Sequence, residues 1–234
     1  MKKSRIATAI IALFVIPLTL ILGSKLPGRG FYLISTLVII EILIPFFLAF
    51  EGRKPQAREL VVIAVMSALS VAARVAIPIP AFKAIFAMIM ISGIALGPES
   101  GFLVGAVAAL GSNFFYGQGP YTPWQMMAYG VAGMLSGLLF EKGWLKRTRI
   151  RLAVYGFACV LCIIGPLLDS CSVFLMATEL TWEFVATIFA SGLPVNFSQS
   201  ISTALVMFLL AEPMLEKLDR VKQKFAIGEE ADGI

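Results

Sequence analysis

A short stretch of the chain, residues 112–130, gathers polar and aromatic side chains that could recognise a small molecule. It reads SNFFYGQGPYTPWQMMAYG. Amide side chains donate and accept hydrogen bonds, and phenol and indole rings offer flat faces on which another ring can stack. Groups of this kind bind a ligand rather than break its bonds, so the pattern favours ligand recognition. The amides and rings concerned are Asn113, Gln118, Tyr121, Trp124 and Gln125.

The residues that most enzymes use are absent or isolated. The chain has no histidine, which excludes Ser-His-Asp and Cys-His catalysis and His-ligated zinc or haem. It has no GxxxxGK[ST] motif, so it cannot bind ATP through a P-loop. Cys159 and Cys162 form a CxxC inside an apolar run, where small packing residues are favoured over a redox or metal pair. We therefore expect no enzyme activity, no metal and no cofactor.

The composition places the polar stretch in a membrane protein. The 234 residues are 59% hydrophobic and 14% charged, whereas soluble domains are about 45–50% apolar and about 25% charged. The mean hydropathy is +0.91. The net charge of +5 comes from clusters beside apolar runs, which indicates membrane orientation rather than nucleic-acid binding. We expect an all-α integral membrane protein.

Eight apolar runs approach the roughly 20 residues that a membrane span needs. The fourth, fifth and sixth runs are short, which suits helices that tilt or end at a cavity. The first follows Met1-Lys2-Lys3-Ser4-Arg5 and could be a signal peptide, but its length and the lack of an A-x-A exit favour a span. The runs are 6–23, 31–50, 60–77, 80–97, 101–115, 124–140, 152–175 and 193–211.

Clusters of lysine and arginine predict the orientation of these spans. With eight spans, the clusters at the N-terminus, in 53–58, in 142–151 and in the C-terminal tail fall on one side. The positive-inside rule then places both termini in the cytoplasm of a cell-membrane protein. Loops 78–83, 116–123 and 176–192 would lie outside, so the polar stretch would be an external loop with its flanking helix ends. An interfacial aromatic belt explains its rings but not its amides.

Four further polar residues lie in or beside the spans, on the same side as the polar stretch. Arg74, near the outer end of its run, either snorkels to the surface or contacts a ligand. Lys83 follows in the next loop. Asp169 could pair with Arg74 or Lys83, or contact a ligand, and Asn196 could face the same cavity.

Small residues also form a stripe on the run 60–77. Ala64, Ala68 and Ala72 share one helix face, and such a stripe lets another helix approach closely. Spacing alone favours a helix of the same chain over another protein. The piece after residue 212 is amphiphilic, and it would either lie on the cytoplasmic membrane surface or form a solvated helix.

The segment from about 58 to 212 resembles the substrate-binding S components of energy-coupling factor (ECF) vitamin transporters. The resemblance is carried by AVMSALSVAAR, by IPIPAFK and by MIMISGIALGPESGFLVGAVAAL. It is also carried by SNFFYGQGPYTPWQMMAYGVAGMLSGLL, whose NFFYGQGPYTPWQM string is similar to the branch linked to cobalamin and related corrinoids.

The resemblance implies a six-helix substrate-binding core with its site near the extracellular face. This core would span residues 51–212, preceded in 1–50 by two additional transmembrane helices that S components usually lack, and followed by a cytoplasmic tail, 213–234. S components work with a transmembrane coupling protein and two cytoplasmic ATPases, and are thought to topple in the membrane to release the substrate. The family's alanine-rich first helix contacts the coupling protein, which would assign Ala64, Ala68 and Ala72 to that interface.

The expected function is therefore capture of a vitamin or precursor, with cobalamin or another corrinoid as the expected ligand. The alternative is a self-sufficient secondary transporter of a small organic solute, which usually shows inverted repeats and midplane carboxylates. A corrinoid needs a far larger cavity than a single heterocycle, so cavity volume distinguishes the two kinds of ligand. Tyr121 and Trp124 would stack on the ligand or cap it, and Arg74 and Lys83 would meet a phosphate or carboxylate. The expected contacts are Arg74, Lys83, Asn113, Gln118, Tyr121, Trp124, Gln125, Asp169 and Asn196.

Overall fold

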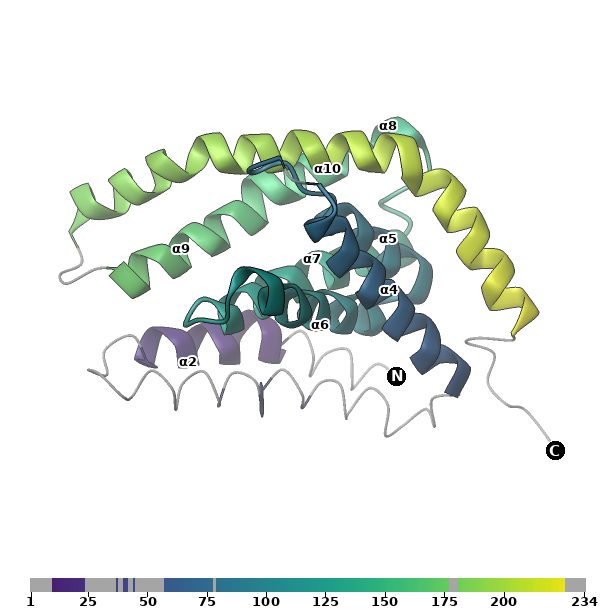
Figure 1. Cartoon of the computed structure of the whole chain (residues 1–234), viewed down its shortest axis with the longest axis horizontal. Coiled ribbons are helices and arrows are strands. Elements are labelled where there is room, and N and C mark those ends of the chain that lie inside the picture. The colour runs from purple at the N-terminus through teal and green to yellow at the C-terminus, as the bar shows by residue number, and fades with distance from the viewer. Residues whose placement is uncertain are drawn as a thin grey trace.

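Helices account for nearly all of the regular structure, and they pack along one another as a bundle (Figure 1). The computed structural model describes residues 10–23, 37, 40, 41, 44, 57–77, 79–176 and 181–225. The helices are the π-helical turn η1 Ile11–Val15, α2 Ile16–Gly23, α4 Ala57–Val75, α5 Ile85–Leu96, α6 Pro98–Tyr116, α7 Thr122–Glu141, α8 Arg149–Cys159, the π-helical turn η2 Val160–Ile164, α9 Gly165–Met176 and α10 Trp182–Lys224.

The apolar runs between residues 60 and 211 are confirmed as helices, with some ends displaced. The run 31–50 lies outside the described residues except at 37, 40, 41 and 44. Among the described helices, two are long and apolar enough to cross a bilayer, namely Arg149–Met176 and Trp182–Lys224. The eight-span arrangement therefore stays a prediction.

The central helices α5, α6 and α7 pack backbone against backbone. A Cβ atom added at Gly93 would lie 2.0 Å from the carbonyl oxygen of Gly133, and one at Gly133 would lie 2.1 Å from that of Gly101. Only glycine permits this approach, because any side chain would need the same space. The contact fixes the register of α6 against α7, and these two helices carry the polar stretch at their shared end.

The start of α10 corrects the expected outer loop 176–192. The helix begins at Trp182 and continues through Pro194. Its first turn is capped by Thr181, whose hydroxyl oxygen accepts a hydrogen bond from the Phe184 backbone N–H at 3.3 Å. Such caps satisfy otherwise unpaired N–H groups at a helix start. The glycine and proline near residue 193 therefore lie inside a helix.

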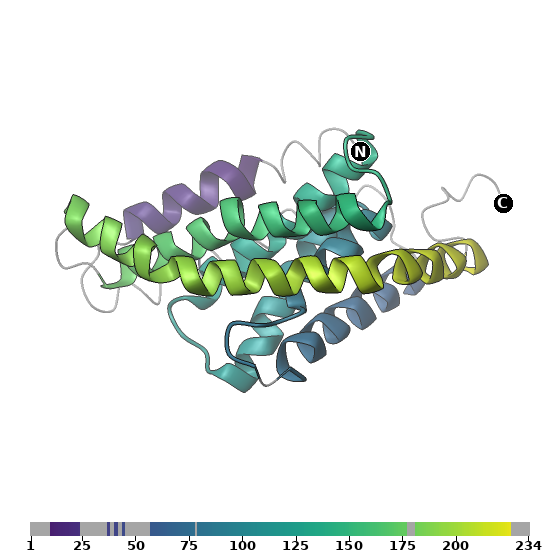
Figure 2. The same cartoon turned by 90° about the horizontal axis from the view of Figure 1, so that it is seen from above.

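The other end of α10 continues into the expected C-terminal tail. Figure 1 shows the helix bending down over one end of the bundle, and Figure 2 shows α8 and α9 along one side of it. Ala211 and Leu215 are buried in the core. Arg147 pairs with Asp219, and Lys222 donates to the backbone oxygen of Ala95 at 2.8 Å. Residues 212–224 thus continue α10 and contact the bundle.

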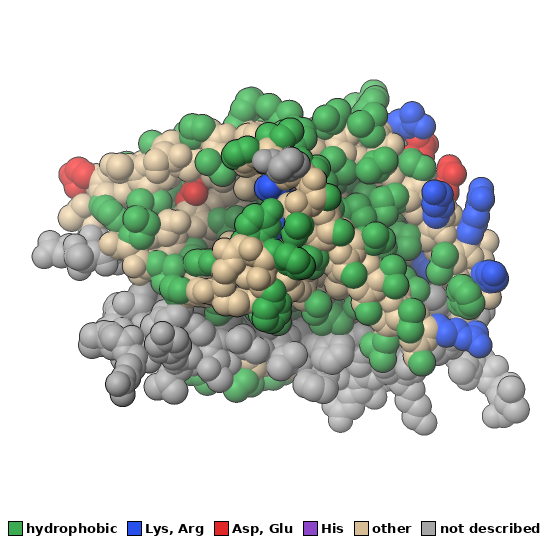
Figure 3. Space-filling model, in the orientation of Figure 1, with side chains coloured by type: hydrophobic (Ala, Val, Ile, Leu, Met, Phe, Trp, Pro, Cys, Tyr) green, Lys and Arg blue, Asp and Glu red, His purple; other side chains and the backbone are tan. Residues whose placement is uncertain are grey.

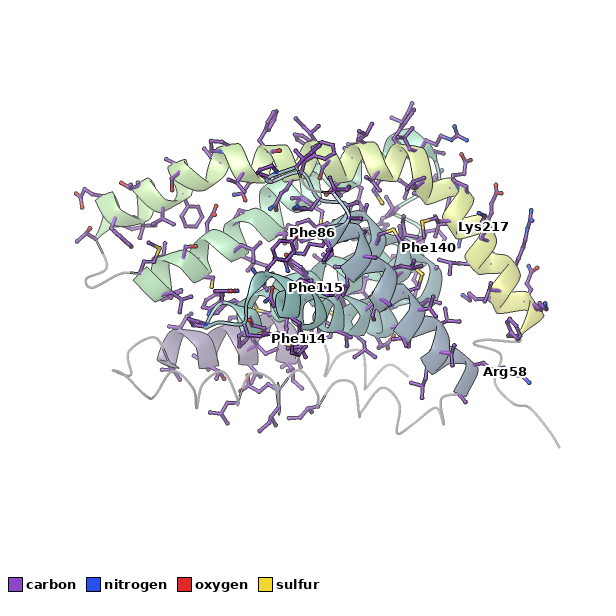
Figure 4. The ribbon with its side chains drawn as sticks, in the orientation of Figure 1. Arg58, Phe86, Phe114, Phe115, Phe140 and Lys217 are labelled. Atoms are coloured by element: carbon purple, nitrogen blue, oxygen red, sulfur yellow. The ribbon has the colours of Figure 1, made fainter. Side chains whose placement is uncertain are left out.

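Positive charge gathers at this same end. Figure 4 shows Arg58 and Lys217 there. The Arg147 guanidinium lies 4.7 Å from the ring centre of Phe140, and Lys142 lies 5.3 Å from that of Trp144. The α6–α7 connection lies away from this basic end (Figure 1).

Candidate functional site

Asn113 is the centre of a hydrogen-bond network at the end of α6 and the start of α7. The side chain is 0% exposed. Its amide nitrogen donates to Gln125 Oε1 at 2.8 Å and to Thr122 Oγ1 at 3.0 Å. Its amide oxygen accepts from Arg74 Nη1 at 2.9 Å. The network joins three helices, α4, α6 and α7, and fixes the orientation of the Gln125 amide.

Arg74 turns into the bundle rather than out to the surface. Besides Asn113, it donates to the hydroxyl of Ser112. Its guanidinium carbon lies 4.8 Å from the ring centre of Tyr116 and 5.8 Å from that of the buried Tyr129. Of the two alternatives that the sequence left open, snorkelling is wrong.

Lys83 lies in a connection that α10 holds in place. Ser202 of α10 accepts from the Lys83 backbone N–H at 3.2 Å and donates to the Lys83 backbone oxygen at 2.6 Å. The ammonium donates to the Ile77 backbone oxygen at 2.6 Å and lies 5.6 Å from the ring centre of Tyr116. Lys83 and Arg74 therefore face one aromatic ring.

Asp169 pairs with an amide and not with a cation. Its Oδ2 accepts from Asn196 Nδ2 at 2.7 Å, which joins α9 to α10. A Cβ atom at Gly192 would lie 2.3 Å from Asp169 Oδ1, and one at Gly165 would lie 2.6 Å from the Asn196 side chain. The two glycines make room for the pair. The ion pair with Arg74 or Lys83, one of the alternatives from the sequence, is not formed.

Trp124 packs against the protein instead of presenting a free face. It is 5% exposed and stacks on Phe174 of α9, with ring centres 5.6 Å apart and planes inclined by 23°. The expectation that Trp124 offers an open stacking face is therefore wrong for this structure.

Gln118 and Tyr121 hold the α6–α7 connection. Gln118 is exposed; it donates to the Leu110 backbone oxygen at 3.0 Å and accepts from Thr122 Oγ1 at 3.0 Å. The Tyr121 hydroxyl donates to the Gly117 backbone oxygen at 2.7 Å.

A cavity of about 430 Å³ opens between the start of α7 and α9. Figure 3 shows this face of the molecule hollowed near its centre, with blue from basic side chains at the edge of the hollow, although the cavity lining itself contains neither lysine nor arginine. The polar groups at the cavity wall come from Tyr121, Gln125 and Ser172, and the rest of the lining is mostly apolar. The lining residues are Tyr121, Gln125, Leu168, Cys171, Ser172, Leu175 and Met176.

Several residues of the site were missed from the sequence. Ser112 and Thr122 complete the Asn113 network, and Tyr116 and Tyr129 flank Arg74. Tyr129 follows Gln125 by four residues, a spacing that puts both on one helix face. Ser202 had no local signal, because its partner Lys83 is 119 residues away in the chain.

The alanine stripe lies on the outside of α4. Ala64, Ala68 and Ala72 are exposed, whereas Met66 and Ser70 of the same helix are buried. Packing against a helix of the same chain, which spacing alone favoured, is therefore not seen in the described part of the protein.

One comparison with known proteins gave a match. A family model described as "ECF-type riboflavin transporter, S component" matches residues 54–216. No curated protein and no solved structure matches the chain.

Proposed function

The chain belongs to the family of ECF-type riboflavin transporter S components, and from this membership we propose that it captures a vitamin in the region around Asn113 and Gln125. The family is one of membrane-embedded transporter subunits and not of enzymes. The observation that carries the proposal is the buried Asn113 network, which aims the Gln125 amide at a mostly apolar cavity. Apolar walls with a few fixed polar groups are typical of small-molecule sites.

The ligand that we propose is a vitamin far smaller than a corrinoid. The cavity of about 430 Å³ lies in the lower part of the range of about 300–1,000 Å³ that is usual for ligand pockets. The family match supports an S component but not the corrinoid branch. A corrinoid is much larger than a single heterocycle, so the volume favours the smaller ligand.

The expected contact residues take different roles in this proposal. Gln125 and Tyr121 contact the ligand from the cavity wall, and Asn113 orients Gln125. Trp124 supports the wall through Phe174, while Gln118 shapes the α6–α7 connection. The other expected contacts supply polar groups to the same region: Arg74 from α4, Lys83 from the α4–α5 connection, Asp169 from α9 and Asn196 from α10.

The test is equilibrium binding to the purified full chain in a neutral detergent. The panel contains riboflavin, thiamine, biotin, nicotinate, pantothenate, pyridoxine, cobalamin and cobinamide. We expect one of the six small vitamins to bind tightly without any partner, and the two corrinoids to bind weakly or not at all. Tight cobalamin binding would restore the corrinoid assignment. Ion-dependent uptake by this chain alone in proteoliposomes, with no tight binding, would support secondary transport.

We expect the double variant Trp124→Ala/Gln125→Ala to raise the Kd of the bound vitamin at least tenfold. It removes the stack on Phe174 and the amide that reads the ligand, and tenfold corresponds to about 1.4 kcal/mol. Trp144→Ala is the matched control, because Trp144 is 74% exposed and lies at the other end of the bundle. A change of less than threefold in the double variant would reduce the start of α7 to a structural role.

The partners that we propose are a transmembrane coupling protein and two cytoplasmic ATPases, since the chain lacks a P-loop of its own. Both termini would be cytoplasmic. Residues 1–50 would add two spans to the core 51–212, and α10 would carry the core's last helix on to residue 224. The exposed alanine stripe of α4 would receive the coupling protein.

Ala68→Trp is expected to abolish both vitamin uptake and co-purification with the coupling protein. The Kd of the isolated chain for its vitamin should stay within threefold of the parent value. A large ring at the centre of the stripe would prevent close helix approach. Val154→Trp, at an exposed position of α8 away from the stripe, is the control. Normal complex formation by Ala68→Trp would place the interface elsewhere.

A further inference from the structure

Two half-buried cations, Arg74 at the end of α4 and Lys83 in the α4–α5 connection, face the ring of Tyr116, and within the described residues neither is paired with a carboxylate. We infer that the ligand carries an anionic group, a carboxylate or a phosphate, and that this group binds between Arg74 and Lys83 beside Tyr116. The inference rests on the proposed vitamin capture and names the class of ligand. It predicts that a neutral vitamin such as riboflavin is not the preferred ligand of this chain.

The guanidinium of Arg74 has N–H groups that make no hydrogen bond to the described residues. Both of its hydrogen bonds, to Ser112 and to Asn113, start from Nη1. A guanidinium has five N–H groups, so those on Nε and Nη2 have no acceptor among the described residues. The partners are neutral and orient the group without offsetting its charge. An arginine drawn in from the surface is costly unless it is paired or lines a cavity.

The ammonium of Lys83 also has N–H groups without an acceptor among the described residues. One of its three N–H groups donates to the Ile77 backbone oxygen. The backbone of Lys83 is held separately by Ser202. The shape of the connection therefore does not depend on the charge, which leaves the ammonium available to a ligand.

The placement of the carboxylates agrees with an anion between these two groups. Asp169 is hydrogen-bonded to Asn196, and the ion pairs found in the described part of the chain join Arg147 to Asp219 and Arg149 to Glu212, toward the basic end. Two like charges beside one ring repel each other. An anion between them would accept charge-assisted hydrogen bonds from both, which are about twice as strong as neutral ones.

The test compares matched ligands that differ in one anionic group. The pairs are flavin mononucleotide and riboflavin, nicotinate and nicotinamide, pantothenate and pantothenol, and biotin and biotinamide. The Kd of each is measured with the purified full chain in a neutral detergent at 50 mM and 500 mM NaCl. In the pair that binds, we expect the anionic member to bind at least tenfold more tightly, and high salt to weaken that member alone.

Variants connect this preference to the two residues. Lys83→Gln and Arg74→Gln are each expected to bring the preference below threefold. Lys142→Gln, which removes a cation at the other end of the bundle, should keep the full preference. Because Arg74 also holds Asn113, the wild-type comparison and Lys83→Gln decide the result even if Arg74→Gln folds poorly.

Four outcomes would overturn the inference, and they are distinguishable. If the neutral member of a pair binds as tightly as the anionic one, vitamin capture stands and the anionic class is wrong. If no member of any pair binds but thiamine or pyridoxine does, vitamin capture again stands and the anionic class is wrong; if no vitamin of the larger panel binds either, the proposed function fails together with the inference. If phosphatidylglycerol added to the detergent displaces the anionic member at equal concentration while phosphatidylcholine does not, a lipid headgroup is the occupant.

Discussion

Gly133→Ala is expected to lower the free energy of unfolding by at least about 2 kcal/mol, which is within the range for overpacked cores. The new Cβ atom would lie 2.1 Å from the carbonyl oxygen of Gly101 and 2.5 Å from its carbon. These are backbone atoms, so α6 and α7 would have to separate. Alanine favours a helix over glycine by about 0.8–1.0 kcal/mol, and this gain is too small to offset the clash. Thermal unfolding in detergent, followed by gel filtration, measures the loss.

Gly111→Ala is the matched control for this variant. Gly111 also lies in α6, but a Cβ atom there would meet a single methyl group, Val71 Cγ2, at 3.2 Å. We expect its stability to stay within about 1 kcal/mol of the parent, since the helix propensity gain opposes a small contact cost. Equal stability of the two variants would show that α6 and α7 do not pack backbone against backbone.

Asn113→Leu is expected to raise the Kd of the bound vitamin at least tenfold and to destabilise the protein. Leucine has a similar size but leaves Arg74, Thr122 and Gln125 without their shared partner. A buried polar group that loses its partner costs about 1–3 kcal/mol. Gln125 would also lose the contact that orients its amide toward the cavity. Binding titration and thermal unfolding of the same preparation separate the two effects.

Gln223→Leu provides the comparison for this amide replacement. Gln223 is exposed at the far end of α10, so the same chemical change there should alter neither the Kd nor the unfolding temperature. If Asn113→Leu behaved like Gln223→Leu, the amide network would contribute nothing to the site.

The helix positions followed from local features of the sequence. Apolar length and the glycine and proline residues of the connections predicted α4 to α9 closely, because a bilayer and the backbone's own hydrogen bonds require long apolar helices. The start of α10 was predicted wrongly. Its glycine and proline near residue 193 are typical of a loop, but Gly192 is needed beside Asp169, and Thr181 caps the helix earlier.

The sequence also predicted which polar residues lie together better than it predicted what each side chain contacts. Amides and rings at 113–125 indicated a binding region, and Asn113 and Gln125 do form one network. Trp124 was expected to stack on a ligand, yet Phe174, 50 positions later in the chain, covers one of its faces. No pattern within either segment shows that α9 lies against the start of α7.

By itself, the sequence determined that this is a helical membrane protein with no histidine and no P-loop motif, because composition, helix length and absent residue types are properties of the chain alone. The tertiary structure decided which way the polar side chains point. Arg74 turns toward Asn113, and Asp169 meets Asn196 rather than a cation. The physical reason is that a side chain's partners depend on how neighbouring helices are rotated and how closely they approach, and distant glycines such as Gly133 set that approach.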